Sequence, residues 1–111
     1  MREIMFRGQS GKAYSFIKMA ANSAWARESG VALFAARGPF GWRVVRLMEL
    51  RGRLHDVQPI WAYADAERYG ANTIFILPET DTEMRRRISH DLQVGLDPVL
   101  ESETQFTALA A

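Results

Sequence analysis

Arginine is the residue type whose spacing in this chain most directly suggests chemistry. Twelve of the fourteen basic residues are arginine. Five of them lie between residues 37 and 53, at Arg37, Arg43, Arg46, Arg51 and Arg53. A planar guanidinium can donate two parallel hydrogen bonds to one phosphate, which a lysine ammonium cannot match. The spacing therefore predicts that these five residues bind the phosphates of DNA or RNA. A GC-rich genome also produces an arginine-rich protein, and the sequence leaves that alternative open.

The five arginines lie in a segment that predicts a β-hairpin. Residues 31–36 and 42–50 are rich in β-branched and large apolar side chains, which favour strands. The intervening Gly38-Pro39-Phe40-Gly41 supplies the backbone angles of a tight reversal. The hairpin then continues into the basic segment 51–54, which is typical of the start of a helix. The hairpin therefore determines how the arginines lie relative to one another.

Four further elements are predicted around the hairpin. Alternating apolar residues favour a strand over 12–19, and the apolar run 72–77 favours a short buried strand that Pro78 ends. Residues 54–69 are predicted to be mainly helical, with Pro59 in a first helical turn. The clearest helix covers residues 80–95, with Thr80 or Asp81 as its cap. Four of its residues fall at helical spacing and are expected to face the core: Met84, Ile88, Leu92 and Gly95.

Together these elements predict a small α+β domain. Its mainly antiparallel sheet has three strands, two from the hairpin and one from 72–77, and helices flank the sheet. The segment 12–19 is a candidate for one extra N-terminal strand. A single domain is expected over residues 8–101, with residues 1–7 and 102–111 as terminal extensions.

The order of these elements, together with several residues, resembles the GIY-YIG nuclease family. Gly30-Val31 begins the hairpin, and Leu50-Arg51-Gly52-Arg53-Leu54 follows the family's pattern of leucine, two variable residues, arginine and an apolar residue. The resemblance makes Arg53 the counterpart of the family's catalytic arginine. The family's two motif tyrosines are replaced here, the first by Ala32 and the second by Arg43.

The late helix carries a second point of resemblance. The family has a metal-binding glutamate, a leucine three residues later, and then an apolar residue, a proline and an asparagine. Leu92, Leu96 and Pro98 follow that spacing. In this frame Ser89 replaces the metal-binding glutamate and Glu101 replaces the asparagine. The resemblance thus assigns five former active-site positions: Ala32, Arg43, Arg53, Ser89 and Glu101.

These replacements remove the groups that cleavage on this scaffold requires. Phosphodiester hydrolysis there needs a divalent cation held by a carboxylate and a polarised water. A serine hydroxyl cannot hold magnesium as a carboxylate does, and Ala32 offers no phenol. The resemblance therefore implies a catalytically inactive GIY-YIG-like domain with no catalytic residue, metal or cofactor. Such a domain is expected to act as a binding module for nucleic acid, through the arginine-lined face of the former active site.

Two other functions remain open at this stage. The first is a protein–protein interaction domain, because arginine mixed with Trp42 and Met48 on the hairpin also suits a protein partner. The second is a residual metal-dependent endonuclease.

The overall composition sets broader limits. The formal net charge of +1 is too small to indicate a nucleic-acid partner by itself. The chain has no cysteine, which excludes a disulfide framework and a thiolate metal site. It also lacks an apolar run near the ~20 residues that a membrane span needs. The sequence therefore predicts a cytoplasmic protein without a membrane partner.

Overall fold

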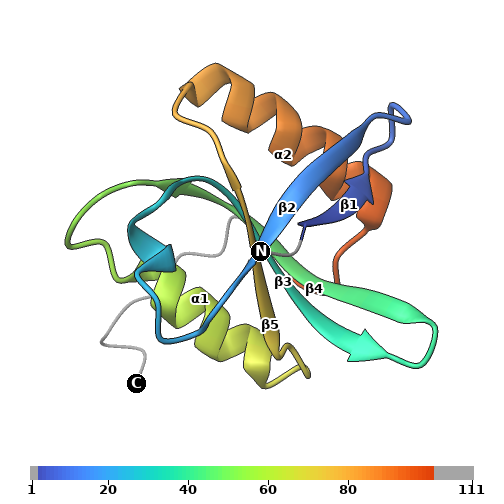
Figure 1. The fold of residues 1–111 in the computed structure, drawn as a ribbon, viewed down its shortest axis with the longest axis horizontal. Helices are drawn as coiled ribbons and strands as arrows, with labels where there is room; N and C mark the ends of the chain where they lie inside the picture. Colours follow the sequence, from blue (N-terminus) through green and yellow to red (C-terminus); the bar gives the residue numbers. More distant parts are fainter. Residues whose placement is uncertain (1–2, 102–111) are drawn as a thin grey trace.

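The computed structural model describes residues 3–101 as a five-stranded sheet with one α-helix on each face (Figure 1). The strands pair in the order β1-β2-β5-β3-β4, and every neighbouring pair is antiparallel. The fold is therefore α+β, as the sequence predicts. The elements are, in chain order, β1 (Glu3–Arg7), β2 (Ala13–Met19), the short 3-10 helix η1 (Trp25–Arg27), β3 (Ser29–Gly38), β4 (Gly41–Arg51), α1 (Gln58–Glu67), β5 (Thr73–Pro78) and α2 (Thr82–Leu96).

The sheet has five strands, whereas the sequence predicts three and offers residues 12–19 as a candidate fourth, which the structure confirms as β2. β2 pairs with β5, where Ile17 lies opposite Ile76, so the sheet continues beyond the hairpin and β5. β1 then pairs with β2 along its whole length, beginning with Glu3 opposite Ile17. Residues 3–7, which the sequence assigns to a terminal extension, thus form an edge strand of the same sheet. Only Phe6 is buried in β1, which is why its pattern in the sequence is weak.

β3 and β4 form the predicted hairpin at the other side of the sheet. Gly38 pairs with Gly41, so the turn consists of two residues, and Gly41 has a φ of 125° that disfavours any side chain. The pairing shifts between Phe34 and Ala35, where Val45 is the extra residue of a β-bulge. The bulge turns both Val45 and the following Arg46 toward the α1 side of the sheet.

The two α-helices cover opposite faces of the sheet (Figure 1). Because side chains alternate along β3, Val31 and Leu33 face α2 while Ala32 and Phe34 face α1. The core on the α2 side is built from Phe6, Phe16, Val31, Leu33, Ala35, Val44, Leu47, Phe75, Ile88 and Leu92. The core on the α1 side is built from Trp25, Ala32, Phe34, Val45, Leu50, Ala62, Ala66, Ala71, Ile74 and Ile76.

Both helices differ from expectation in one detail. α1 begins at Gln58, with Pro59 in its first turn as predicted, but residues 54–57 form a loop rather than helix. In α2, Ile88 and Leu92 are buried as predicted, whereas Met84 is 40% exposed. Arg85 takes the inward position of the first turn instead. The buried stripe of α2 is therefore Arg85, Ile88, Ser89 and Leu92.

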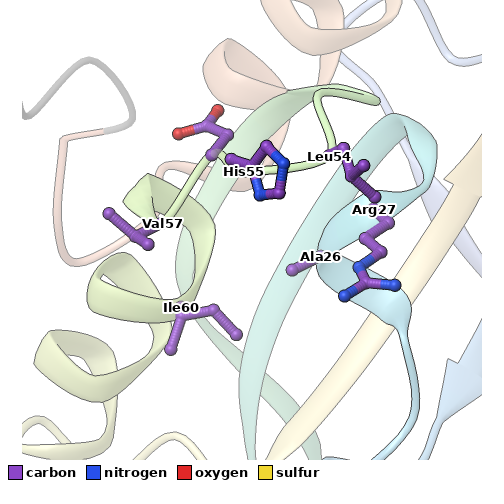
Figure 2. A pocket seen from close by; sticks show the side chains of 7 residues that line it. Ala26, Arg27, Leu54, His55, Val57 and Ile60 are labelled. Atoms are coloured by element: carbon purple, nitrogen blue, oxygen red, sulfur yellow. The ribbon is translucent and has the colours of Figure 1, made fainter.

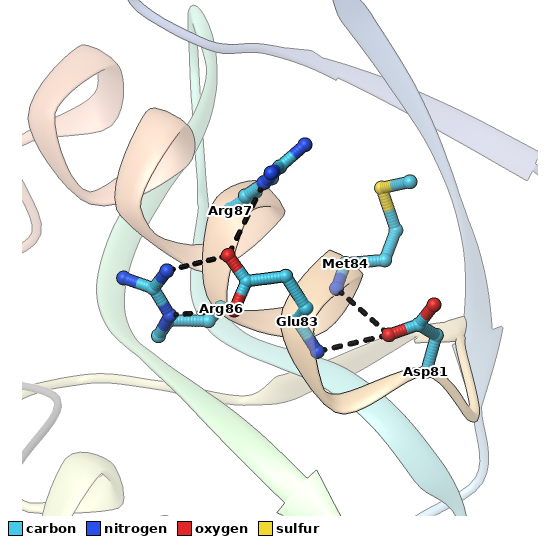
Figure 3. Close-up of polar contacts among 5 residues, drawn as sticks. All are labelled: Asp81, Glu83, Met84, Arg86 and Arg87. Atoms are coloured by element: carbon cyan, nitrogen blue, oxygen red, sulfur yellow. Dashed lines mark hydrogen bonds and ion pairs between the residues drawn. The ribbon is translucent and has the colours of Figure 1, made fainter.

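The N-terminal end of α2 is capped as the sequence predicts. The Asp81 carboxylate accepts hydrogen bonds from the backbone N–H groups of Glu83 and Met84 (Figure 3). In the same turn, Glu83 accepts hydrogen bonds from Arg86 and Arg87. The hydrogen bonds from Arg86 are the main cause that lowers the pKa of Glu83. These contacts neutralise two adjacent arginines on the outer face of α2.

Asp91 fastens the β1–β2 hairpin to the same helix. Its carboxylate accepts hydrogen bonds from the Ser10 N–H at 2.8 Å, the Ser10 hydroxyl at 2.7 Å and the Tyr14 hydroxyl at 2.7 Å. Two glycines allow this approach. A Cβ at Gly8 would lie 2.2 Å from Asp91 Oδ2, and a Cβ at Gly95 would lie 2.5 Å from the nitrogen of Gln9.

Candidate functional site

The five hairpin arginines do not share one surface. Arg37 and Arg43 lie near the turn of the hairpin, whereas Arg51 and Arg53 lie at its opposite end. Arg43 and Arg51 are eight positions apart along β4, which corresponds to about 26 Å along a strand. Arg46 lies between them and is only 2% exposed. The arginines of the hairpin are therefore divided among its two ends and the interior.

Arg46 belongs to the interior on the α1 side. Its guanidinium donates to the carbonyl of Ala62 at 3.2 Å and to the Asp65 carboxylate at 3.1 Å. Burial lowers the pKa of Arg46, and the charge of Asp65 partly offsets this effect. The contacts join β4 to α1, so Arg46 holds the helix on the sheet and is not available at the surface for a phosphate.

Arg37 and Arg43 also make contacts within the domain. The Arg37 guanidinium stacks over the ring of Trp42 at 5.2 Å. Trp42 itself packs edge-on against Phe75 and lies against the core on the α2 side. Arg43 donates to the carbonyl of Tyr69, just beyond α1, at 2.8 Å. These two arginines brace the turn end of the sheet.

The five positions that the resemblance assigns to a former active site do not lie together in the structure. Ala32 is fully buried in the core on the α1 side, whereas Ser89 is buried on α2, which covers the opposite face. The sheet therefore separates the two positions. Arg43 and Arg53 lie toward opposite ends of β4. Glu101 ends the described region, one residue after Leu100 donates its N–H to the carbonyl of Val45.

Arg85 is a buried cation that sequence reasoning missed. It is 6% exposed. Its guanidinium donates to four neutral oxygens, which are Ser29 Oγ at 2.8 Å, the carbonyls of Glu79 and Thr80, and Thr82 Oγ1. Its Nε has no hydrogen-bond partner. Arg85 therefore ties α2 to the first residue of β3 and leaves a full positive charge at this end of the sheet.

Three exposed arginines surround the same end of the sheet, which we call the Ser29 end because β3 begins there. Arg51 lies directly opposite Ser29 in the β3–β4 ladder. Arg53 follows after Gly52, which has a φ of 70° and where an added Cβ would lie 3.7 Å from the carbonyl oxygen of Arg27. The segment from Arg51 to Arg53 therefore runs against the end of η1, where Arg27 is exposed.

The guanidinium groups of these three arginines make none of the ion pairs found within residues 3–101. Those ion pairs use Arg46, Arg68, Arg86 and Arg87, with Asp65 or Glu83 as the acid. Most other arginines of the described region are thus neutralised or packed. We call Arg27, Arg51 and Arg53 the arginine cluster because their backbones meet at the Ser29 end of the sheet. The Arg51 side chain shares the α2 face with Ser29, whereas Arg27 lies on the α1 face, where it lines a hollow.

A hollow of about 480 Å³ adjoins the arginine cluster (Figure 2). It lies between η1 and the segment that leads into α1. Its apolar lining is Ala26, Leu54, Val57 and Ile60, and its polar lining is Arg27, His55 and Asp56. Leu54, Val57 and Ile60 are 61%, 46% and 51% exposed. The hollow is therefore an apolar surface open to solvent, with arginines beside it.

Within residues 3–101, no group of three or more His, Asp or Glu side chains is arranged to hold a metal ion. In the same part of the chain, neither α-helix is long and apolar enough to span a membrane. Comparisons of the chain with protein-family models, with curated proteins and with solved structures gave no match.

The sequence reasoning found Arg51 and Arg53 but missed the residues that lie around them. Arg27 is remote from the hairpin in sequence, and no local pattern relates it to Gly52. Leu54 and Ile60 both fall in the predicted helical segment 54–69. Ile60 lies in α1, whereas Leu54 lies in the loop before it. The one signal in the sequence that could have indicated the hollow is the set of apolar residues Leu54, Val57 and Ile60, which follows Arg51 and Arg53.

Proposed function

We propose that this protein is a catalytically inactive GIY-YIG-like domain that binds nucleic acid, with the arginine cluster holding phosphate groups. The observation that carries the proposal is the position of Arg27, Arg51 and Arg53. All three are exposed at the Ser29 end of the sheet, and none takes part in the ion pairs of the described residues.

The chemistry of the cluster favours phosphate as the ligand. A guanidinium presents a planar set of donors that fits two oxygens of one phosphate. Arg85 adds a buried guanidinium at the same end of the sheet, and its hydrogen bonds go to neutral oxygens. Contacts to successive phosphates of one strand position a nucleic acid without reading its sequence. We therefore expect binding that depends strongly on salt and weakly on sequence.

Two features support the GIY-YIG-like part of the proposal. The hairpin, α1, β5 and α2 follow in the order that the resemblance implies. Arg53, the counterpart of the family's arginine, belongs to the arginine cluster. The absence of a phenol at Ala32 and of a carboxylate at Ser89 favours binding without cleavage.

Fluorescence anisotropy with a labelled 12-nucleotide single strand tests this function. Counterion release predicts that the logarithm of the binding constant falls with the logarithm of the salt concentration, with a slope of about −2 for three phosphate contacts. Arg51→Ala should reduce the size of that slope by about 0.7. Arg68→Ala, which removes an exposed arginine from the end of α1, should leave the slope unchanged. Absence of binding at low salt for both DNA and RNA would overturn the proposal.

A further inference from the structure

We propose that the hollow beside the arginine cluster receives an unpaired nucleobase, so that the ligand is single-stranded nucleic acid. This inference rests on the proposed function, because the cluster has to hold the phosphates of the same strand. It adds the form of the nucleic acid and a second contact surface, neither of which follows from the arginines alone.

The hollow and the arginine cluster lie next to each other. Arg53 and Leu54 are consecutive residues, so their Cα atoms are about 3.8 Å apart. Arg27 belongs to both surfaces, because it lines the hollow and lies beside Gly52 of the cluster. A strand whose phosphate contacts Arg27 or Arg53 therefore has its base within reach of the hollow.

The side chains that line the hollow suit the surface of a nucleobase. A nucleobase has two apolar faces and a polar edge, and the hollow offers both kinds of surface. Leu54, Val57 and Ile60 expose aliphatic side chains to water, and covering them with a base would be favourable. His55 provides a ring on which a base can stack. Asp56 accepts from the backbone N–H of Gln58 through Oδ1, and its second oxygen can accept from an exocyclic amine. Figure 2 shows the His55 ring between Leu54 and the start of α1.

The openness of the hollow determines which form of nucleic acid can place a base in it. The hollow of about 480 Å³ is open to solvent, so a base can lie against its apolar lining without any rearrangement of the surrounding segments. In a duplex the bases are stacked and paired, so they cannot enter a side pocket without costly unstacking. The hollow is therefore expected to favour a single strand over a duplex of the same sequence.

The experiment compares three labelled 12-nucleotide ligands by fluorescence anisotropy at one low salt concentration. They are an intact single strand, its duplex, and a single strand of abasic residues that keeps every phosphate. One stacked base is worth about tenfold in affinity, so the intact strand should bind about tenfold more tightly than the abasic strand. It should also bind more tightly than the duplex.

Variants of the hollow provide the second arm. Leu54→Ala with Ile60→Ala should weaken the intact strand about tenfold but leave the abasic strand unchanged, because the phosphate contacts remain. Both side chains are at least half exposed, so the variant should fold, and its melting temperature checks this. Val94→Ala removes an exposed valine from α2 and serves as the matched control.

The outcomes separate this inference from the proposed function. Equal affinity for all three ligands, with an unchanged salt slope, would overturn the inference and leave phosphate binding intact. Equal loss of affinity for intact and abasic strands in the hollow variant would also overturn it. If no ligand binds at low salt, both the inference and the proposed function are overturned.

Discussion

The carboxylate of Asp91 accepts hydrogen bonds from both the backbone N–H and the hydroxyl of Ser10, a residue 81 positions earlier in the chain. The turn between β1 and β2 thereby becomes part of the surface of α2. Within this glycine-rich turn, the Asp91 carboxylate accepts both donors of Ser10, and the N–H of Gln9 donates to the backbone carbonyl of Asp91. The turn therefore secures the edge of the sheet, and an external anion would have to displace Asp91 to bind there.

Replacing Asp91 should loosen this attachment in a pH-dependent manner. Hydrogen bonds from the Ser10 hydroxyl and N–H, followed by that from Tyr14, lower the pKa of Asp91. A carboxyl whose folded-state pKa lies below its unfolded value of about 3.9 stabilises the fold above that value. This stabilisation is lost as the pH falls through the folded-state pKa.

Asp91→Asn should therefore lower the melting temperature at pH 7, and the difference from wild type should shrink below about pH 3.9. Thermal unfolding followed by circular dichroism across this pH range is the measurement. Glu67→Gln, which changes an exposed carboxylate on α1, should show no comparable effect. A difference that stays constant down to acid pH would mean that the charge of Asp91 is not what holds the hairpin.

Gly95→Ala should destabilise the domain although alanine is the better helix former. Glycine inside a helix ordinarily costs about 1 kcal/mol relative to alanine. Here the new Cβ would lie 2.5 Å from the backbone nitrogen of Gln9, and such overpacking costs about 2 kcal/mol. Urea denaturation should show the loss. Gly38→Ala, whose Cβ would meet only the Gly41 oxygen at 3.4 Å, should change stability by less than about 0.5 kcal/mol.

The buried pair of Arg46 and Asp65 predicts an asymmetry between its two partners. Asp65→Asn leaves the guanidinium of Arg46 buried without its carboxylate, which should cost about 3 kcal/mol. Arg46→Met removes the cation, keeps an apolar stem, and leaves a carboxylate that is 26% exposed, so it should cost less. Denaturant unfolding of the two variants gives the comparison. A larger loss for Arg46→Met would show that packing or other contacts of Arg46 outweigh the charge.

The elements that the sequence predicted correctly are those with a strong local pattern. The hairpin has a glycine-proline turn between two apolar strands, and α2 has a cap at Asp81 and apolar residues at helical spacing. β1 lacks such a pattern, because Phe6 is its only buried residue and Ile4 is only partly buried against the core. Its identity as a strand depends on β2 and β5, which lie far away in sequence.

The candidate site was less predictable because its residues are placed by segments that lie far apart in the sequence. Simple alternation along β4 does not place Arg46 in the interior; the bulge at Val45 does, and its acidic partner comes from α1. Arg85 lies inward although it is charged, because four oxygens from separate segments converge on it. Arg27 joins the cluster only through the packing of η1 beside Gly52. Each of these placements depends on tertiary contacts that no local pattern records.

The absence of cleavage is a separate prediction. A supercoiled plasmid and a labelled single strand incubated with magnesium or manganese should remain intact, because no tyrosine occupies position 32 and no carboxylate occupies position 89. Arg53→Ala provides the control, since any background cleavage from a contaminant should be the same in this variant. Metal-dependent cleavage that disappears in Arg53→Ala would instead establish a residual nuclease.

We propose that nucleic acid is bound by the arginines at the Ser29 end, and not by those at the turn of the hairpin. Two double variants with equal loss of charge test it most directly, namely Arg51→Ala with Arg53→Ala and Arg37→Ala with Arg43→Ala. Their affinities for one labelled single strand are measured by anisotropy at the same low salt. We expect the first variant to lose about tenfold or more in affinity and the second to change little. Equal losses for both, or a larger loss for the second, would contradict it.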